Sequence, residues 1–291
     1  MKKLTFTLLL LLGGLTGAWS QVQFPYPAIP DVLQDEQARL GFVLEHFWTQ
    51  YRFDDLSQTN RDVAEQGFAD FINLMQYADS TTCSRAAQVL ADSMTVSEQR
   101  LRHFDGLIDH YLGNPNSPLR NDVTYAHLLR ALTQRLPDGD ATRGRLAFRL
   151  QLVERNQPGT LATDFEYVDR EGRRHRLYDI ESALTLIVFS DPECEHCHEL
   201  MPRIIGSQTL LNDKRLTVLN IYPDDNRQAW EADAKALPAN WREGRSPEGE
   251  IMHKQLYALP AMPSLYLLDS QKRVLIKDGT LEQVERRIND K

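Results

Sequence analysis

Two cysteines, Cys194 and Cys197, are separated by two residues and follow an apolar run. When such a pair occupies the first turn of a helix, the two sulfurs are close enough to bond without unfolding it. The first cysteine then faces the positive end of the helix dipole and unpaired backbone amides, which favour the thiolate. We therefore predict that Cys194 attacks a substrate disulfide and that Cys197, the more buried thiol, resolves the mixed disulfide.

Charged neighbours of the dithiol act on the thiolate in opposite directions. His196 lies directly before Cys197 and would stabilise a thiolate when protonated, which makes it a candidate supporting residue. Glu193 and Glu195 would destabilise a thiolate by charge repulsion. Inspection of the sequence leaves the balance between these effects open.

The same residues fit three other interpretations. Cys194 and Cys197 followed by His198 match the attachment pattern of c-type haem, in which His198 would be an axial ligand. With His196 these side chains are a possible zinc or copper site, although ligands crowded on one turn rarely complete a tetrahedron. A third alternative is a binding or structural module whose two cysteines form only a stabilising disulfide. The interpretation as a redox dithiol requires neither a cofactor nor a metal.

Strands and helices alternate around the dithiol. Residues 184–189 form a nearly continuous apolar run, which is typical of a central strand buried on both faces. A helix is expected to begin at residue 193, and a second buried strand at residues 215–221. The other expected elements are a hairpin of residues 164–168 and 173–178, strands at 264–268 and 274–276, and a final helix at 281–288.

The residues before this region show helical spacing and no strand-type alternation. From Leu40 to Tyr51 apolar residues recur along one helical stripe, a capping box is expected at residues 95–98, and a last helix at about 141–154. The pattern predicts a bundle of five or six helices that ends near Asn156, where helix-breaking residues follow. The histidines of this region have no convincing metal-ligand spacing, and Cys83 is interpreted as a small buried side chain.

The first twenty residues have the layout of a secretory signal. Two lysines precede an apolar run at residues 4–15, and cleavage is expected after Ser20. An uncleaved N-terminal anchor is the alternative. We therefore expect an exported, periplasmic protein, and its net charge of −8 argues against a nucleic-acid partner.

Residues 158–291 resemble the thioredoxin fold, with the TlpA/ResA-like exported thiol-disulfide oxidoreductases as the most similar branch. The motifs that carry the resemblance are the apolar strand, the Cys194–Cys197 pair, Pro202 in the following helix, and Met262 with Pro263 before the late strand. The resemblance implies that Pro263 is cis and packs beside the dithiol. It also implies that the Met262 backbone is offered to an incoming peptide.

Residues 30–155 resemble an uncharacterised helical domain that precedes such modules in bacterial envelope proteins. The expected fold class is therefore α+β with two domains, an all-α helical bundle at 21–157 and a thioredoxin-like α/β domain at 158–291. The implied partners are protein thiols and disulfides of the cell envelope, together with an unidentified membrane or periplasmic redox partner.

The sequence departs from the family pattern at two positions beside the dithiol. Glu193 stands where the family has a tryptophan before the first cysteine. Leu200 stands where TlpA/ResA-like proteins have a glutamate as proton acceptor. The residues from Cys197 to Leu200 are also similar to those of exported disulfide isomerases, so the direction of electron flow stays open.

Overall fold

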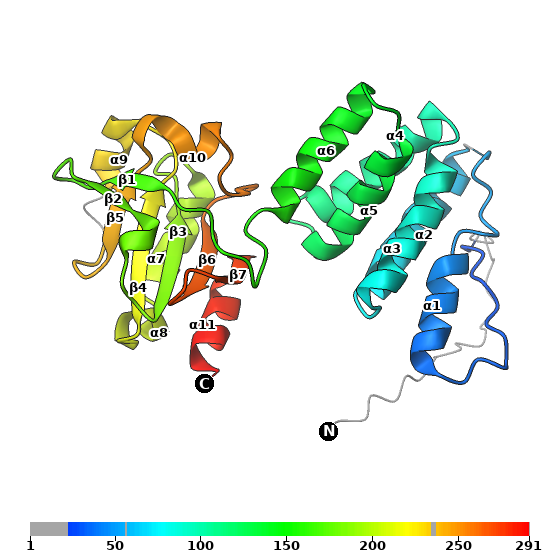
Figure 1. Cartoon of the computed structure of the whole chain (residues 1–291), viewed down its shortest axis with the longest axis horizontal. Coiled ribbons are helices and arrows are strands. Elements are labelled where there is room, and N and C mark those ends of the chain that lie inside the picture. The colour runs from blue at the N-terminus through cyan, green and yellow to red at the C-terminus, as the bar shows by residue number, and fades with distance from the viewer. Residues whose placement is uncertain (1–22, 56, 234–236, 291) are drawn as a thin grey trace, which may run out of the picture. The chain divides into compact units, whose positions relative to one another are not determined.

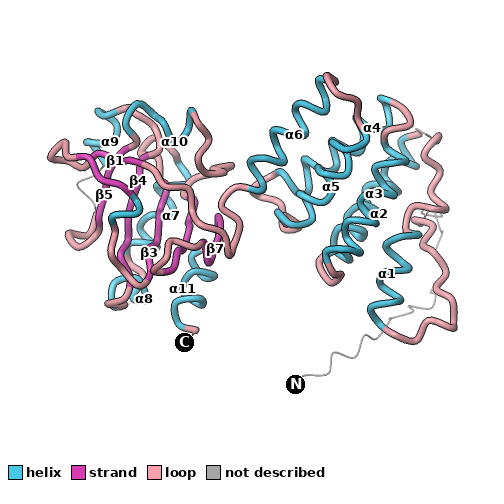
Figure 2. The backbone as a smooth tube through the Cα atoms, in the orientation of Figure 1, coloured by secondary structure: helices cyan, strands magenta, loops and turns pink. Residues whose placement is uncertain are grey.

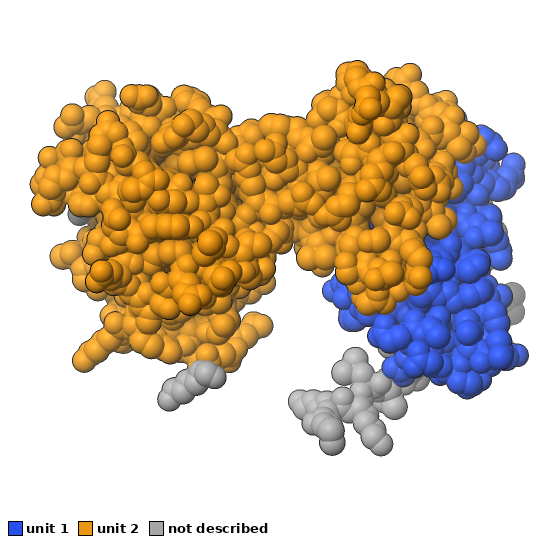
Figure 3. Space-filling model, in the orientation of Figure 1, with its two compact units in different colours: residues 1–78 blue, residues 79–291 orange. Residues whose placement is uncertain are grey.

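The computed structural model describes residues 23–55, 57–233 and 237–290, and the predicted signal peptide lies outside them. The chain divides into two compact units, residues 1–78 and 79–291, which Figure 3 colours separately. The predicted domain boundary at 157/158 lies inside the second unit and stays a prediction. Within the described residues, no helix combines the length and apolar character that a membrane span requires.

The first unit contains helices α1 (Glu36–His46) and α2 (Gln58–Met75). The prediction of one helical stripe through Tyr51 is wrong, because α1 ends at His46 and the chain turns there. Three rings beyond this point instead surround Phe24, with centroids 4.8 Å away for Phe47, 5.2 Å for Trp48 and 5.9 Å for Tyr51. Helical spacing thus identified the buried residues but not the backbone that carries them.

The second unit begins with helices whose contacts join α5 to α3 and α6. Ser97 is the N-cap of α4 and its hydroxyl accepts from the Arg100 backbone N–H at 3.3 Å, whereas Thr95 is the C-cap of α3. The predicted capping box at 95–98 is therefore wrong. A single bundle stays a prediction, since α1 and α2 belong to the other unit. The helical elements are α3 (Ser80–Met94), α4 (Glu98–Ile108), the π-helical η1 (Asp109–Gly113), α5 (Asp122–Arg135) and α6 (Ala141–Glu154).

Seven strands of the described residues form one sheet in the order β2-β1-β5-β4-β3-β6-β7 (Figures 1 and 2). The central strand β3 pairs in parallel with β4 and antiparallel with β6. The strands are β1 (Glu166–Val168), β2 (Arg174–Arg176), β3 (Leu184–Phe189), β4 (Leu216–Tyr222), β5 (Arg242–Arg245), β6 (Ser264–Asp269) and β7 (Val274–Gly279).

Strand β5 was not predicted from the sequence, because it lacks an apolar alternation. This strand is short and polar, and it forms because its backbone pairs in parallel with β4. Gly244 is required there, because a Cβ atom would lie 2.5 Å from the Tyr167 ring and 2.9 Å from the Val168 carbonyl oxygen. The strand thus depends on tertiary pairing and close backbone approach.

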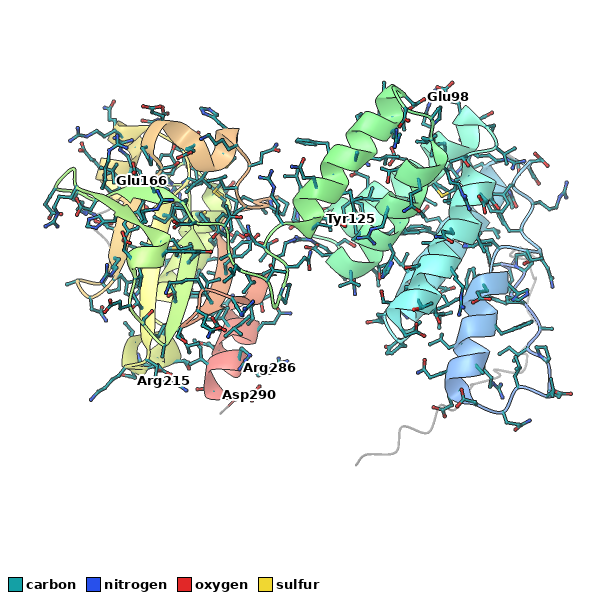
Figure 4. All side chains as sticks on the ribbon, viewed as in Figure 1. Glu98, Tyr125, Glu166, Arg215, Arg286 and Asp290 are labelled. Atoms are coloured by element: carbon teal, nitrogen blue, oxygen red, sulfur yellow. The ribbon has the colours of Figure 1, made fainter. Side chains whose placement is uncertain are left out.

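Both faces of the sheet are covered, as predicted for β3. Ile187 and Phe189 belong to one buried cluster, whereas Leu186 and Val188 belong to a second cluster that includes residues of α7, α8 and α11. Arg215 donates to the Ile288 carbonyl at 2.8 Å and so links the start of β4 to α11 (Figure 4). The remaining helical elements are η2 (Leu177–Asp179), α7 (Glu195–Ile205), α8 (Gln208–Asn212), α9 (Arg227–Asp233), η4 (Pro247–Gly249), α10 (Glu250–His253) and α11 (Leu281–Asn289).

Candidate active site

The two cysteines lie at and just after the connection between β3 and α7. Helix α7 begins at Glu195, two residues later than the predicted start at residue 193. Cys194 is therefore its N-cap residue, and Cys197 lies in the first helical turn. The thiol of Cys194 is partly exposed, whereas Cys197 is only 2% exposed. Neither cysteine is in a disulfide. Stepwise disulfide exchange requires this arrangement, in which one thiol at the helix N-terminus is accessible and the second is buried behind it.

The Cys194 sulfur lies against the segment that precedes β6. Its Sγ donates to the Met262 carbonyl oxygen at 3.6 Å, and the Met262–Pro263 peptide bond is cis, as the sequence resemblance implies. These residues meet although 68 positions separate them, because β3 and β6 are neighbours and Phe189 pairs with Ser264. The sheet therefore brings together Cys194, Met262 and Pro263.

The Cys197 sulfur accepts a hydrogen bond from the Asp191 backbone N–H at 3.5 Å. Burial raises the pKa of the Cys197 thiol to about 12, and the hydrogen bond from Asp191 only partly opposes this effect. The neighbouring Cys194 thiol and the Asp191 charge are smaller causes of the same increase in pKa. Cys197 is therefore a protonated thiol at neutral pH and must lose a proton before it can act as a nucleophile.

Asp191 is a neighbour of the dithiol that was not among the predicted site residues. Its carboxylate accepts from the Glu193 backbone N–H at 2.8 Å, and its carbonyl accepts from the Cys194 N–H at 3.2 Å. These bonds shape the turn that carries the first cysteine to the helix N-terminus. The available signal was the Asp-Pro pair after an apolar strand, which is typical of turn initiation.

The two histidines beside the cysteines have different partners. His196 is largely exposed, and its Nδ1 lies 3.6 Å from a carboxylate oxygen of Glu199. His198 Nε2 bonds with the Pro192 carbonyl at 2.7 Å. Within residues 23–55, 57–233 and 237–290 no group of three or more histidine, cysteine or acidic side chains is placed to hold a metal ion.

A groove with a volume of about 300 Å³ adjoins Pro263. Its walls come from α7, β6 and the start of α11, and from a loop of the helical region before α5. The sequence analysis missed the loop residues because no periodicity or motif distinguishes them. The residues that line it include Pro115, Asn116, Arg120, His196, Leu200 and Arg203.

Comparisons with known proteins match both halves of the chain. A family described as a domain of unknown function (DUF5106) matches residues 2–156. A thioredoxin-like protein from Bacteroides caccae is 30% identical, with a TM-score of 0.83 over 91% of this chain and 97% of that one. The fold of this chain is therefore thioredoxin-like. No curated protein matches the chain.

Two further solved structures correspond to just under half of the chain. The C-terminal domain of an uncharacterised protein from Bacteroides fragilis is 36% identical over 46% of this chain and 99% of that one, with a TM-score of 0.45. The thioredoxin domain of a thiol-disulfide oxidoreductase from Bacteroides vulgatus is 20% identical over 46% of this chain and 99% of that one, with a TM-score of 0.39.

Proposed function

We propose that this chain, which belongs to the DUF5106 family, is an exported thiol-disulfide oxidoreductase that exchanges disulfides with cell-envelope proteins through Cys194 and Cys197. The observation that carries the proposal is the position of the Cys194 sulfur, 3.6 Å from the Met262 carbonyl oxygen beside a cis proline. Export is inferred from the signal-like residues 1–20. The TlpA/ResA-like type is inferred from the sequence resemblance.

In the forward reaction the Cys194 thiolate attacks one sulfur of a substrate disulfide. The substrate S–S bond breaks, a Cys194–substrate disulfide forms, and the departing substrate thiolate takes up a proton. Cys197 then gives up its proton and attacks Cys194 Sγ. This second attack forms the Cys194–Cys197 disulfide and releases the other substrate thiol, so that the substrate gains the two electrons that the dithiol loses.

The backbone beside the dithiol is suited to hold a peptide. Met262 and Pro263 are partly exposed and lie directly before β6. A substrate segment in extended conformation would donate a backbone N–H to the Met262 carbonyl once the Cys194 thiol has reacted. Main-chain pairing of this kind tolerates many substrate sequences, which suits an enzyme that acts on several proteins.

The test is to trap the mixed disulfide with Cys197→Ser. The variant is mixed with insulin, whose chains are joined by disulfides, and its mass is measured under non-reducing conditions. We expect an adduct through Cys194 that dithiothreitol reverses, because serine cannot resolve it. The double variant Cys194→Ser, Cys197→Ser is the matched control and should form no adduct.

The proposal fails if the single variant forms no adduct and the unmodified chain catalyses neither insulin reduction nor disulfide scrambling. A Cys194–Cys197 disulfide that resists reduction by common thiols would instead support a stabilising disulfide in a binding module.

A further inference from the structure

We propose that residues 115–120 form one wall of the substrate groove and select protein disulfides with an apolar side chain next to the cysteine. This inference rests on the proposed function and assigns a role to the helical region. Pro115, Asn116 and Arg120 line the groove beside Pro263, although all three precede the sheet region in sequence. A substrate that is bound at Cys194 and extends past Pro263 into the groove would contact this loop.

Hydrogen bonds join the loop to strands β6 and β7, and the cis proline directly precedes β6. Arg120 Nη1 donates to Asp278 Oδ2 at 2.6 Å, and Asp278 Oδ1 accepts from the Ser264 hydroxyl at 2.6 Å. Ser264 is the residue after Pro263. The Arg120 and Asp278 side chains are 20% and 12% exposed, so the ion pair is shielded from most of the solvent. The position of the loop is thus tied to the position of the proline through two hydrogen bonds.

A second ion pair with the opposite polarity lies one residue away on β7. Lys277 Nζ lies 2.8 Å from Asp122 Oδ2, and the Lys277 side chain is only 3% exposed. Lys277 also donates to the Val153 carbonyl at 2.5 Å, at the end of α6. Lys277 and Asp278 thus each have a partner of opposite charge at residues 120–122, and Arg120 Nη2 also lies 3.6 Å from Asp122 Oδ1, so the four charges form one network.

The groove has apolar surface, and the arginines in its walls already have acidic partners. Arg120 is bonded to Asp278, and Arg203 lies 2.8 Å from Glu282. Pro115, Leu200 and Pro263 contribute the apolar surface. A charged substrate side chain entering here would lose hydration without gaining an unpaired partner, whereas an apolar side chain would not. A volume of about 300 Å³ is small for a cofactor site and suits the side chains of an extended peptide.

The experiment measures the second-order rate at which the reduced full-length chain reacts with three disulfides in single turnovers. The probes are a disulfide-linked peptide with leucine on both sides of the cysteine, the same peptide with glycine, and bis(2-hydroxyethyl) disulfide. We expect the leucine peptide to react about tenfold faster than the glycine peptide, the discrimination typical of one apolar side chain in a pocket. Asn116→Trp, which fills the groove from the loop side, should reduce that ratio to about one.

Two further variants make the result specific to the loop. Arg120→Ala removes the anchor and should also reduce the leucine-to-glycine ratio by at least threefold. Arg145→Ala is the matched control, because it removes an arginine of α6 that lies outside the groove and 3.8 Å from Asp105, and it should leave the ratio unchanged. Thermal unfolding of each variant shows that it is folded.

The outcomes separate this inference from the proposed function. If the unmodified chain reacts with none of the three disulfides, the proposed function fails. If it reacts with all three but shows no leucine preference, the inference about the groove fails alone. It also fails if folded Asn116→Trp retains the preference, or slows the reaction with all three probes by the same factor.

Discussion

Helices α3 and α7 each carry a cysteine in the first turn, yet only α7 has the features of a reactive site. At α3 the N-cap is Asp79, whose carboxylate accepts from the Thr81 and Thr82 backbone N–H groups at 2.8 and 3.0 Å. At α7 the N-cap is Cys194, and its side chain makes no capping hydrogen bond. The helix amides that are bonded to a carboxylate in α3 therefore remain available to a thiolate in α7.

The surroundings of Cys83 and Cys194 also favour a reactive thiol only at Cys194. Cys83 is only 4% exposed, and burial together with the Asp79 charge raises the pKa of its thiol. Cys194 is partly exposed and contacts the Met262 carbonyl, which belongs to a neighbouring strand connection. A helix N-terminus is thus a reactive site only where the cap leaves the amides available and a neighbouring segment provides a place for the substrate.

The largest expected effect separates the two helices directly. Cys194→Ser should abolish the catalysed part of insulin reduction and leave only the rate that dithiothreitol gives alone, because the hydroxyl cannot replace the thiolate nucleophile. Cys83→Ser should keep the catalysed rate within about twofold of that of the unmodified chain. Equal losses in the two variants would contradict the distinction between α3 and α7.

The second effect concerns the pH dependence of the resolving step. Burial is the largest cause of the raised pKa of Cys197, and this cause persists when Cys194 is in a mixed disulfide. Below that pKa the thiolate fraction grows about tenfold per pH unit, so the mixed disulfide should decay about 100-fold faster at pH 8 than at pH 6. Rapid acid quenching and mass measurement give the decay rate, with Cys197→Ser as the variant that should not decay. A rate independent of pH would show that proton loss from Cys197 does not limit resolution.

The same raised pKa has a consequence for stability. The folded chain holds the Cys197 proton more tightly than the unfolded chain, whose cysteines titrate near pH 8.5. The stabilisation is therefore complete below about pH 8.5 and is lost as the pH rises toward 12. The stability of the unmodified chain should fall more steeply over this range than that of Cys197→Ser.

The smallest expected effect concerns caps that only stabilise their helices. Ser97 in α4 and Thr280 in α11 each accept from a backbone N–H at 3.3 Å. Ser97→Ala and Thr280→Ala should each lower the free energy of unfolding by about 1 kcal/mol, the usual cost of losing an N-cap. Chemical denaturation measures this change. Ser97→Ala should leave disulfide exchange unaltered, and a loss of exchange there would link α4 to the chemistry.

Elements with a strong local pattern were predicted well. The helix at 141–154 and the strand at 184–189 have the predicted bounds, and the strand is a nearly continuous apolar run. The stripe through Tyr51 was wrong because spacing cannot report a turn that keeps the same rings buried. The strand β5 was missed because four polar or small residues carry no period, and only pairing with β4 makes them a strand.

The sequence by itself determined the dithiol, since a spacing of two residues at a strand-to-helix junction is a local property of the chain. It also indicated the late proline through a family resemblance. Only the tertiary structure decided what surrounds the sulfurs, because strand pairing brings Met262 to Cys194 across 68 residues. The ion pair of Arg120 with Asp278 spans 158 residues and depends on the burial of both side chains. Contacts at such separations leave no period in the sequence, so neither the groove nor its wall of residues 115–120 was predictable from it.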